Sequence, residues 1–265
     1  MPIGPPPGAA LVTGASSGIG RAYAESLAQR GYEVIAVARR ERRLRELVSA
    51  LNDRGPRAPR FIVADLSKAS GLQACRDAIG PTGVDVAVLN AGFGSLGPVA
   101  EADRRGQADM VRLNCVAVVD LACHVLPGMV RRGRGAVVVV SSAAADQPIP
   151  FMSTYAASKA FGLHFTEALA EELRGTGVRA IAVSPGPVRT EFGDSAAGAL
   201  SWPVPYSRAE RVVERTWEGL RRGRGRVGVG PVSMLSQVAR PLPRVISLRL
   251  AGHLHRRRAG RAAPS

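Results

Sequence analysis

Short apolar runs alternate with longer amphipathic stretches from the start of the chain to about residue 185. The apolar runs have the length and the Val, Ala and Ile content of buried strands, and the stretches between them have the spacing of helices. Strands are predicted at 9–13, 33–37, 60–64, 84–89, 136–141 and 179–183. Helices are predicted to begin near Gly18, Glu41, Ser67, Asp103 and Thr154.

Repeated strand and helix units whose strands are apolar throughout indicate a parallel sheet covered by helices on both faces. The predicted fold class is therefore α/β, with a single doubly wound parallel sheet. A helix over 208–222 and a last strand over 226–229 complete it. The Gly- and Pro-rich stretch from 185 to 205 is typical of a long loop beside a ligand, and we assign a lid to about 187–207.

Residues 1–231 are predicted to form one domain, because no internal repeat or linker interrupts them. Residues 232–265 are predicted to be a basic, partly amphipathic extension. Apolar residues recur every four positions in this extension, at Leu242, Ile246, Leu250 and Leu254. The pattern favours a helix that packs on its own domain; the alternatives are an interfacial membrane helix or a contact with a partner.

Positive charge is concentrated at the C-terminal end. The chain has 36 Lys and Arg against 21 Asp and Glu, a net charge of +15, but residues 219–265 hold eleven arginines and no acidic residue. The first 218 residues carry only +4, from 25 basic and 21 acidic residues. Such a segment either attracts anionic lipid, acidic protein or phosphate-bearing ligands, or is a solvated tail. Nucleic acid is not a predicted partner, because these residues contain no Phe, Tyr or Trp to stack on bases.

Cysteine usage and the N-terminal residues bear on the compartment. Cys75, Cys115 and Cys123 are odd in number and lack the spacing of metal ligands, so neither a disulfide framework nor a metal site is predicted. Residues 1–8 show neither the basic nor the apolar region of a signal peptide, and no run of about 18 apolar residues occurs. We expect a cytoplasmic protein without a membrane span, in which the basic extension is the candidate for peripheral membrane contact.

A glycine-rich turn follows the first predicted strand, with the sequence Thr13-Gly-Ala-Ser-Ser-Gly-Ile-Gly20. Gly14 permits a tight turn, Gly18 lets the backbone approach a pyrophosphate, and Gly20 allows close packing of the helix that follows. The first amides of that helix point toward the anion. The position between strand and helix is the one that dinucleotide binding requires.

The GxxxGxG spacing of this turn, taken with further motifs, resembles the short-chain dehydrogenase/reductase family. The resemblance extends from about residue 8 to residue 192 and implies a Rossmann-type sheet. The other motifs stand in family order: Asp65-Leu66, Asn90-Ala91-Gly92, Asn114, Ser142, Tyr155-Ala-Ala-Ser-Lys159, and Pro185-Gly186 with Thr190.

Four residues are predicted to carry the chemistry: Asn114, Ser142, Tyr155 and Lys159. Tyr155 and Lys159 are four positions apart and therefore share one face of a helix. A free phenol has a pKa near ~10, so a cation beside it would stabilise the phenolate and tune proton exchange. The resemblance implies that Lys159 also binds the nicotinamide ribose and that Ser142 holds the substrate oxygen. It further implies that Asn114 organises a helix irregularity and a proton-relay water, and that Ser141 is a strand-end residue.

The end of the second predicted strand favours NADP(H) over NAD(H). It reads Ala36-Val-Ala-Arg39-Arg40, without the acidic residue that binds the ribose hydroxyls of NAD. Arg39 is predicted to grip a 2′-phosphate, and Arg40 either assists or, as we favour, begins a solvated helix.

The resemblance implies further cofactor contacts. Asp65 contacts the adenine amino group, Asn90 supports the cofactor at the sheet edge, and Thr190 with the Val188 backbone holds the carboxamide. The predicted cofactor-binding residues are Gly14, Ser16, Ser17, Gly18, Ile19, Gly20, Arg39, Asp65, Leu66, Asn90, Ala91, Gly92, Tyr155, Lys159, Pro185, Gly186, Val188 and Thr190.

Apolar residues flank the predicted catalytic tyrosine and populate the lid, namely Phe93, Pro148, Ile149, Pro150, Phe151, Met152, Phe192, Leu200, Trp202, Val204 and Tyr206. They suit an apolar ligand, or else pack the lid against the protein's own core. The predicted function is an NADPH-dependent oxidoreductase that interconverts a carbonyl and an alcohol on a lipid-, steroid- or retinoid-like or 3-oxoacyl substrate. The alternative is an NADP(H)-binding sensor or scaffold without turnover. A homodimer or homotetramer is implied by the resemblance.

Overall fold

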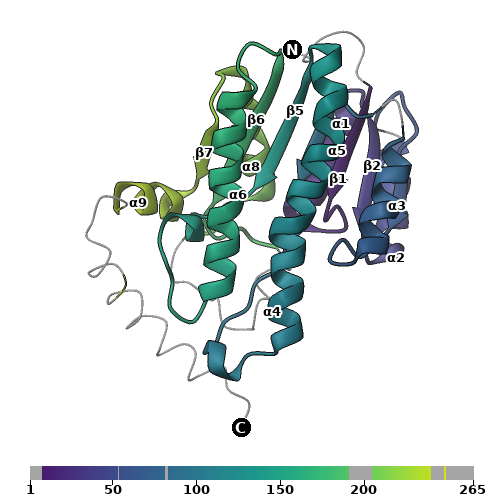
Figure 1. Ribbon diagram of the computed structural model, residues 1–265. Helices are drawn as coiled ribbons and strands as arrows, with labels where there is room; N and C mark the ends of the chain where they lie inside the picture. The colour runs from purple at the N-terminus through teal and green to yellow at the C-terminus, as the bar shows by residue number, and fades with distance from the viewer. Residues whose placement is uncertain (1–7, 53, 81–82, 191–204, 240–247, 249–265) are drawn as a thin grey trace.

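The computed structural model describes residues 8–52, 54–80, 83–190, 205–239 and 248. Its centre is a parallel seven-stranded sheet in the order β3-β2-β1-β4-β5-β6-β7 (Figure 1). The strands are β1 (Ala9–Thr13), β2 (Glu33–Ala38), β3 (Arg60–Val63), β4 (Val86–Leu89), β5 (Gly135–Val140), β6 (Val178–Pro185) and β7 (Arg226–Val229). Strand order reverses between β1 and β4, which opens a crevice at their carboxyl ends. The predicted doubly wound α/β fold is confirmed.

Helices cover both faces of the sheet. One face carries α1 (Gly18–Gln29), α2 (Glu41–Asn52) and α8 (Ala209–Arg221). The other carries α3 (Ala69–Ile79), α5 (Ala117–Arg132) and α6 (Ser153–Glu172). The shorter elements are α4 (Arg104–Val111), α9 (Pro231–Ala239), the π-helical turn η2 (Arg112–Val116) and the 3₁₀ turns η1 (Val99–Glu101) and η3 (Ala143–Asp146).

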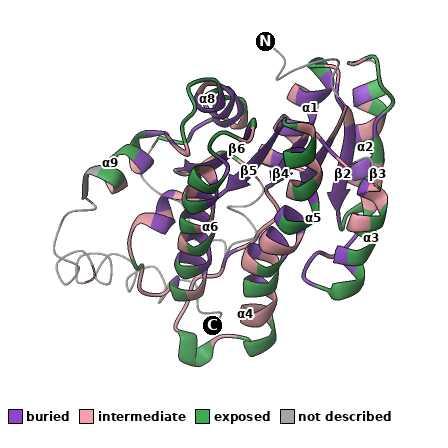
Figure 2. Cartoon of the chain, turned by 45° about the horizontal axis from the view of Figure 1, so that its top comes forward, coloured by how far each residue is buried: buried purple, intermediate pink, exposed green. Residues whose placement is uncertain are grey.

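Successive residues of each central strand enter two different cores. In β1, Ala10 and Val12 pack beneath α1 and α2, whereas Leu11 packs on the opposite face with α3 and α5. Both faces of these strands are therefore buried, as are the inner sides of the helices (Figure 2). Burial on both faces explains why the strands read as continuous apolar runs without alternating polar positions.

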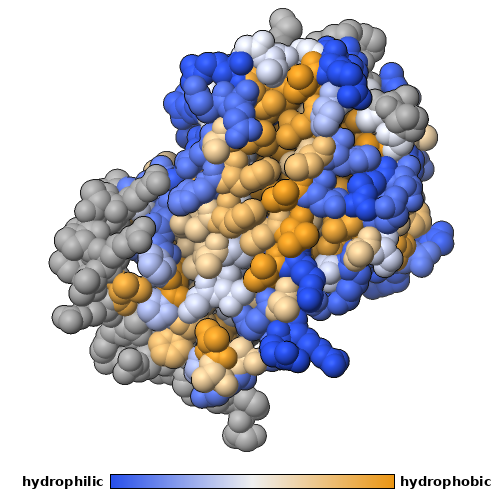
Figure 3. All heavy atoms as spheres, viewed as in Figure 1, coloured by the Kyte–Doolittle hydropathy of each residue, from blue (hydrophilic) through white to orange (hydrophobic). Residues whose placement is uncertain are grey.

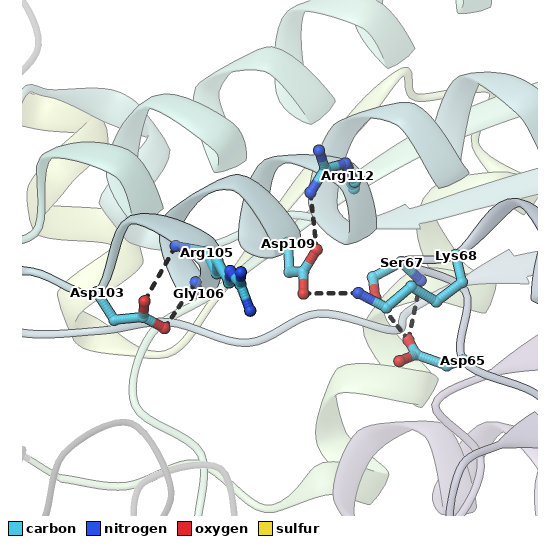
Figure 4. Close-up of polar contacts among 8 residues, drawn as sticks. All are labelled: Asp65, Ser67, Lys68, Asp103, Arg105, Gly106, Asp109 and Arg112. Atoms are coloured by element: carbon cyan, nitrogen blue, oxygen red, sulfur yellow. Dashed lines mark hydrogen bonds and ion pairs between the residues drawn. The ribbon is translucent and has the colours of Figure 1, made fainter.

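The element ends follow local signals in the sequence. The Asp103 carboxylate caps α4 by accepting hydrogen bonds from the backbone nitrogens of Arg105 at 3.0 Å and Gly106 at 2.8 Å (Figure 4). Strand β6 extends through Pro185, two residues beyond its predicted end. Proline is tolerated there because it stands at the end of the strand.

Residues 104–132 form one continuous helix through α4, η2 and α5. By length and composition alone this helix could cross a membrane, and 39% of its most apolar window is buried inside the fold. Its buried side packs on β4 and β5, as in the core helix of a globular domain. Figure 3 shows that apolar side chains also gather on the outer face over α5 and α6.

Two predicted features fall largely on residues that the structure does not describe. The helix predicted through Leu242 and Leu254 lies outside the described residues except at position 248, and the lid lies outside them over 191–204. The two ends of the lid are described and are joined. Val188 bridges Ser207, and the Ser207 backbone nitrogen donates to the Pro187 carbonyl at 2.9 Å.

Candidate active site

The turn between β1 and α1 leaves no room for side chains at its three glycines. Gly14 and Gly18 have φ angles of 66° and 54°, which other residues rarely adopt. A Cβ atom on Gly20 would lie 2.3 Å from the Gly14 carbonyl oxygen, so α1 packs directly on the turn. The first amides of α1 are thereby exposed to an anion placed on the turn, and this geometry fits the pyrophosphate of a dinucleotide.

Thr13 and Asn90 fasten this turn to β4. The Thr13 hydroxyl accepts hydrogen bonds from the backbone nitrogens of Asn90 at 2.9 Å and Ala91 at 3.0 Å. The Asn90 side chain donates to the Thr13 carbonyl oxygen at 2.9 Å. These bonds place Asn90 and Ala91 at the crevice between β1 and β4. Thr13 was missing from the predicted cofactor residues, although it begins the glycine-rich motif.

Arg40 folds back onto the glycine-rich turn. Its guanidinium donates to the Ser16 hydroxyl at 3.0 Å and to the Ser17 hydroxyl at 2.8 Å. Arg40 is exposed and stands at the start of α2, as the preferred interpretation held, but its guanidinium also contacts the turn. The Arg40 carbonyl accepts a hydrogen bond from the Leu44 backbone nitrogen at 3.1 Å at the start of α2, while its side chain reaches back to the turn. Arg39, the predicted phosphate contact, is exposed beside it.

The loop between β3 and α3 is tied to α4 (Figure 4). An Asp65 carboxylate oxygen accepts hydrogen bonds from the Ser67 backbone nitrogen at 3.0 Å and the Ser67 hydroxyl at 2.8 Å. Lys68 and Arg112 each donate to the Asp109 carboxylate at 2.8 Å, and these two hydrogen bonds lower the pKa of Asp109. The predicted adenine loop is thus linked to α4, a contact that the sequence pattern did not indicate.

Tyr155 and Ser142 meet at the end of β5. Tyr155, in the first turn of α6, is buried and shares a side-chain hydrogen bond with Ser142. Burial raises the pKa of the Tyr155 phenol, and the hydrogen bond to Ser142 offsets part of that rise. The Ser142 hydroxyl also accepts from the Ala144 backbone nitrogen at 3.1 Å. The neighbouring Ser141 is directed elsewhere, since its hydroxyl donates to the Lys159 carbonyl at 2.7 Å.

Lys159 lies one helical turn after Tyr155, and its side chain is buried. Its Nζ donates to the Val140 carbonyl at 2.9 Å and lies 6.0 Å from the centre of the Tyr155 ring. Burial lowers the pKa of Lys159 to about 8, while the nearby Cys115 acts in the opposite direction. Burial is also the largest influence on the pKa of Tyr155. In this structure, burial therefore affects the pKa of Tyr155 more than the predicted stabilisation of its phenolate by Lys159.

Asn114 lies in the π-helical turn η2. Its side-chain nitrogen donates to the Phe93 carbonyl at 3.0 Å and to the Ser158 hydroxyl at 2.9 Å, and its side-chain oxygen accepts from the Phe93 backbone nitrogen at 3.2 Å. The side chain thereby joins the loop after β4 to α6. A π-turn is the kind of helix irregularity that the resemblance implied at this position. Ser158, the third member of this network, was not predicted.

An apolar wall surrounds Tyr155. Among the described residues, only Phe151 is a non-glycine residue with positive φ, at 67°. Its carbonyl accepts a hydrogen bond from the Gly97 backbone nitrogen at 2.8 Å, which joins the loop after β4 to the loop before α6. A Cβ atom on Gly94 would lie 2.9 Å from the Tyr155 ring. The side chains packed around Tyr155 are Phe93, Leu96, Met110, Ala144, Ile149 and Met152.

The segment after β6 returns to the glycine-rich turn. The Gly186 backbone nitrogen donates to the Val229 carbonyl at 2.8 Å. Thr190 reaches the turn itself, since a Cβ atom on Gly18 would lie 2.8 Å from the Thr190 methyl carbon. The Thr190 hydroxyl is within 3.5 Å of the Val188 carbonyl oxygen. Thr190, in the segment after β6, therefore lies beside Gly18 of the glycine-rich turn.

Comparison with known proteins agrees with this geometry. Residues 8–199 match the family model described as short chain dehydrogenase. The chain belongs to this family. The family membership expected from the motifs is thereby confirmed.

Several known proteins are similar in sequence to this short-chain dehydrogenase. A short chain dehydrogenase of Pseudocercospora fijiensis is 40% identical over 192 residues, which cover 69% of this chain and 60% of that protein. A very-long-chain 3-oxoacyl-CoA reductase of Anas platyrhynchos is 33% identical over 217 residues, which cover 78% of this chain and 69% of that protein. The alignment with the first of these therefore spans less than two thirds of that relative's length.

Solved structures share the same fold. A short-chain dehydrogenase from Sphingobium yanoikuyae in complex with NADPH superposes with a TM-score of 0.80 at 30% identity, over 91% of this chain and 95% of that one. The structure brings the predicted residues of the present dehydrogenase together at one edge of the sheet, where Arg39 directly follows β2 and is exposed, as Arg40 is. It adds Thr13 and Ser158, and it shows the contact of Arg40, the alternative assistant of Arg39, with the turn.

Proposed function

We propose that this chain is an NADP(H)-dependent oxidoreductase that interconverts a carbonyl and an alcohol on an apolar substrate, with Tyr155 moving the proton. The observation that carries the proposal is the buried hydrogen bond between Tyr155 and Ser142, one helical turn from Lys159 and next to the dinucleotide-type turn. A proton donor, an oxygen-binding hydroxyl and a buried amine thus converge where the sheet opens.

The glycine-rich turn and Arg40 support NADP(H) as the cofactor. Gly14, Gly18 and Gly20 leave the backbone free for a pyrophosphate. The Arg40 guanidinium donates hydrogen bonds to the hydroxyls of Ser16 and Ser17. A 2′-phosphate at this position would gain charge-assisted hydrogen bonds from it. No acidic side chain stands between residues 34 and 40 to repel that phosphate.

Each of the four candidate catalytic residues has a separate role in the proposed reaction. The nicotinamide supplies or accepts the hydride when it is bound. Ser142 holds the substrate oxygen by a hydrogen bond, and Tyr155 gives that oxygen its proton in reduction and takes it back in oxidation. Lys159 in its ammonium form binds the ribose and assists the loss of the phenol proton. Asn114 keeps the loop after β4 at a fixed distance from α6 through Phe93 and Ser158.

The apolar wall supports an apolar substrate. Phe93, Leu96, Ile149 and Met152 border Tyr155, and such a lining binds apolar molecules beside a few oriented polar groups. A relative is named as a 3-oxoacyl-CoA reductase for very long chains, which is consistent with this class of substrate. Steroids, retinal and 3-oxoacyl thioesters are therefore the first carbonyl compounds to try, with sugars and quinones as polar and aromatic comparisons.

The Tyr155→Phe variant tests the proposal. Turnover of the best carbonyl substrate should fall by about 10² to 10⁴-fold, because the ring remains and only the proton donor is lost. The Kd for NADPH should stay within about threefold of the wild type, since the phenol hydroxyl is a small part of the contact. Near-normal turnover in the variant would contradict the assignment. Tight NADPH binding without turnover of any carbonyl compound would favour the sensor instead.

We also propose that the outer face of α5 and α6 contacts a second copy of the chain. Figure 3 shows the apolar side chains gathered there. Val116 and Phe161 are exposed on this face, and the Phe161 ring stacks on Phe165 at 6.1 Å. An exposed apolar area of this kind favours burial in an interface. Light scattering should show a dimer or tetramer for the wild type and a monomer for Phe161→Glu.

A further inference from the structure

Helix α9 is attached to the domain through its polar side chains. Ser233 is fully buried, and its hydroxyl accepts a hydrogen bond from the Gln237 side chain at 3.3 Å. The Ser236 hydroxyl donates to Asp146 at 2.6 Å. Asp146 is itself buried in an ion pair with Arg226 of β7. The Ser236 hydroxyl therefore joins α9 to a buried ion pair, and Val232, which is half-buried beside Gly186, adds an apolar contact.

Two large apolar side chains of α9, those of Met234 and Leu235, face away from the domain. Met234 is 55% exposed and Leu235 is 68% exposed, and Leu235 is the most exposed large hydrophobic residue in the described part of the chain. At 100° per residue these two positions lie 100° and 200° around the helix from the buried Ser233. A helix on a protein surface normally has the opposite polarity, with apolar residues toward the core. Met234 and Leu235 are therefore free to enter an apolar environment outside the domain.

The composition of the chain after α9 indicates what that environment is. Residues 240–265 add seven arginines and two histidines, with no Asp or Glu. Two copies that met through α9 would bring two such segments together and would repel each other. An anionic lipid surface attracts the same charges and accepts apolar side chains at the boundary of its headgroups. Charge and apolar exposure therefore both fit a membrane.

We infer that α9 docks on anionic lipid surfaces, with Met234 and Leu235 entering the interface and the positive charge of residues 240–265 adding attraction to the headgroups. The sheet and the active site remain in water. The contact is peripheral and reversible, because two side chains and a short basic segment give less binding than a membrane-spanning helix.

Cosedimentation with vesicles tests this inference on the full-length protein. Vesicles of phosphatidylcholine with 30% phosphatidylserine should bind it, pure phosphatidylcholine vesicles should not, and NaCl at about 0.5 M should release it because salt screens the attraction. The double variant Met234→Ser/Leu235→Ser should lose affinity for the anionic vesicles by about tenfold or more. The matched control Val63→Ser, which removes another exposed apolar side chain on β3, should bind like the wild type.

A cut after Ala239 separates the contribution of the apolar side chains of α9 from that of the arginines that follow it. It removes the seven arginines and retains α9 with its bonds to Asp146, whereas a cut after Pro231 would remove those bonds as well. The shortened chain should bind weakly and without salt dependence. Full vesicle binding by the double variant would overturn the role of α9. The inference would also fail if no vesicles bound the wild type, if the double variant converted an oligomer to a monomer, or if it lost thermal stability.

Discussion

Lys159 on α6 donates a hydrogen bond of 2.9 Å to the carbonyl oxygen of Val140, the last residue of β5. The bond joins the helix that carries Tyr155 to the strand that leads into Ser142. It also gives the buried ammonium a partner, without which burial of the charge would be far more costly. The lowered pKa of about 8 shows that burial still disfavours the charged form. Cofactor binding that uses this amine is therefore expected to depend on pH.

The affinity for NADPH should weaken as the pH rises through about 8. Below that value Lys159 is an ammonium with three donors, and above it the amine loses the charge that attracts the cofactor. The Kd should be constant below pH 8 and then rise by up to about tenfold per pH unit. Fluorescence titration between pH 6.5 and 9.5 measures this. Lys159→Met should bind more weakly and with a flat profile, and an unchanged slope in that variant would exclude Lys159 as the titrating group.

Arg40 should set the preference for NADPH over NADH. Loss of a charge-assisted contact to phosphate costs ~1.5 to 3 kcal/mol, or about one to two decades in affinity. Arg40→Ala should weaken NADPH by that amount and NADH much less, as measured by calorimetric titration. Arg39→Ala is the matched control, because it removes the same charge from the adjacent residue, which is exposed as Arg40 is. A larger loss in the Arg39 variant would restore the assignment made from sequence.

Phe151 should combine backbone strain with control of substrate choice. Its φ of 67° costs about 1 to 2 kcal/mol for a residue with a Cβ atom, and the Gly97 hydrogen bond holds it there. Phe151→Gly should therefore be more stable toward urea than Phe151→Ala by about 1 kcal/mol. Both variants should show altered ratios of kcat/KM between bulky and small ketones. Equal stability of the two variants would show that the position is not strained.

The buried pair of Asp146 and Arg226 should contribute strongly to folding. The Asp146 side chain is fully buried and that of Arg226 nearly so. Asp146→Ala should lower the free energy of unfolding by about 3 to 5 kcal/mol, because it leaves a buried guanidinium without its main partner. Glu171→Ala breaks the exposed pair with Arg174 and should cost less than about 1 kcal/mol. Urea denaturation compares them, and similar losses would mean that burial does not govern these pairs.

Local patterns determined most of the sheet and the identity of the candidate residues. The strands predicted at 9–13 and 226–229 match β1 and β7, and the helices predicted at Gly18 and Glu41 begin there. These features depend on side-chain periodicity and on glycine, which act over a few neighbouring residues. The four-residue spacing of Tyr155 and Lys159 likewise placed them on one helix face without any knowledge of the sheet.

Contacts between distant segments were decided only by the tertiary structure. Arg40 and Arg39 are equivalent as sequence, and the path of the chain before α2 alone brings Arg40 to Ser16. The pKa of Lys159 follows from its burial, and burial depends on the packing of α6 against the sheet. The outward orientation of Met234 and Leu235 follows from the position of Asp146, eighty-eight residues before Met234, which draws the polar side of α9 inward. Periodicity shows that a helix has two faces, but only the groups packed against it decide which face is buried.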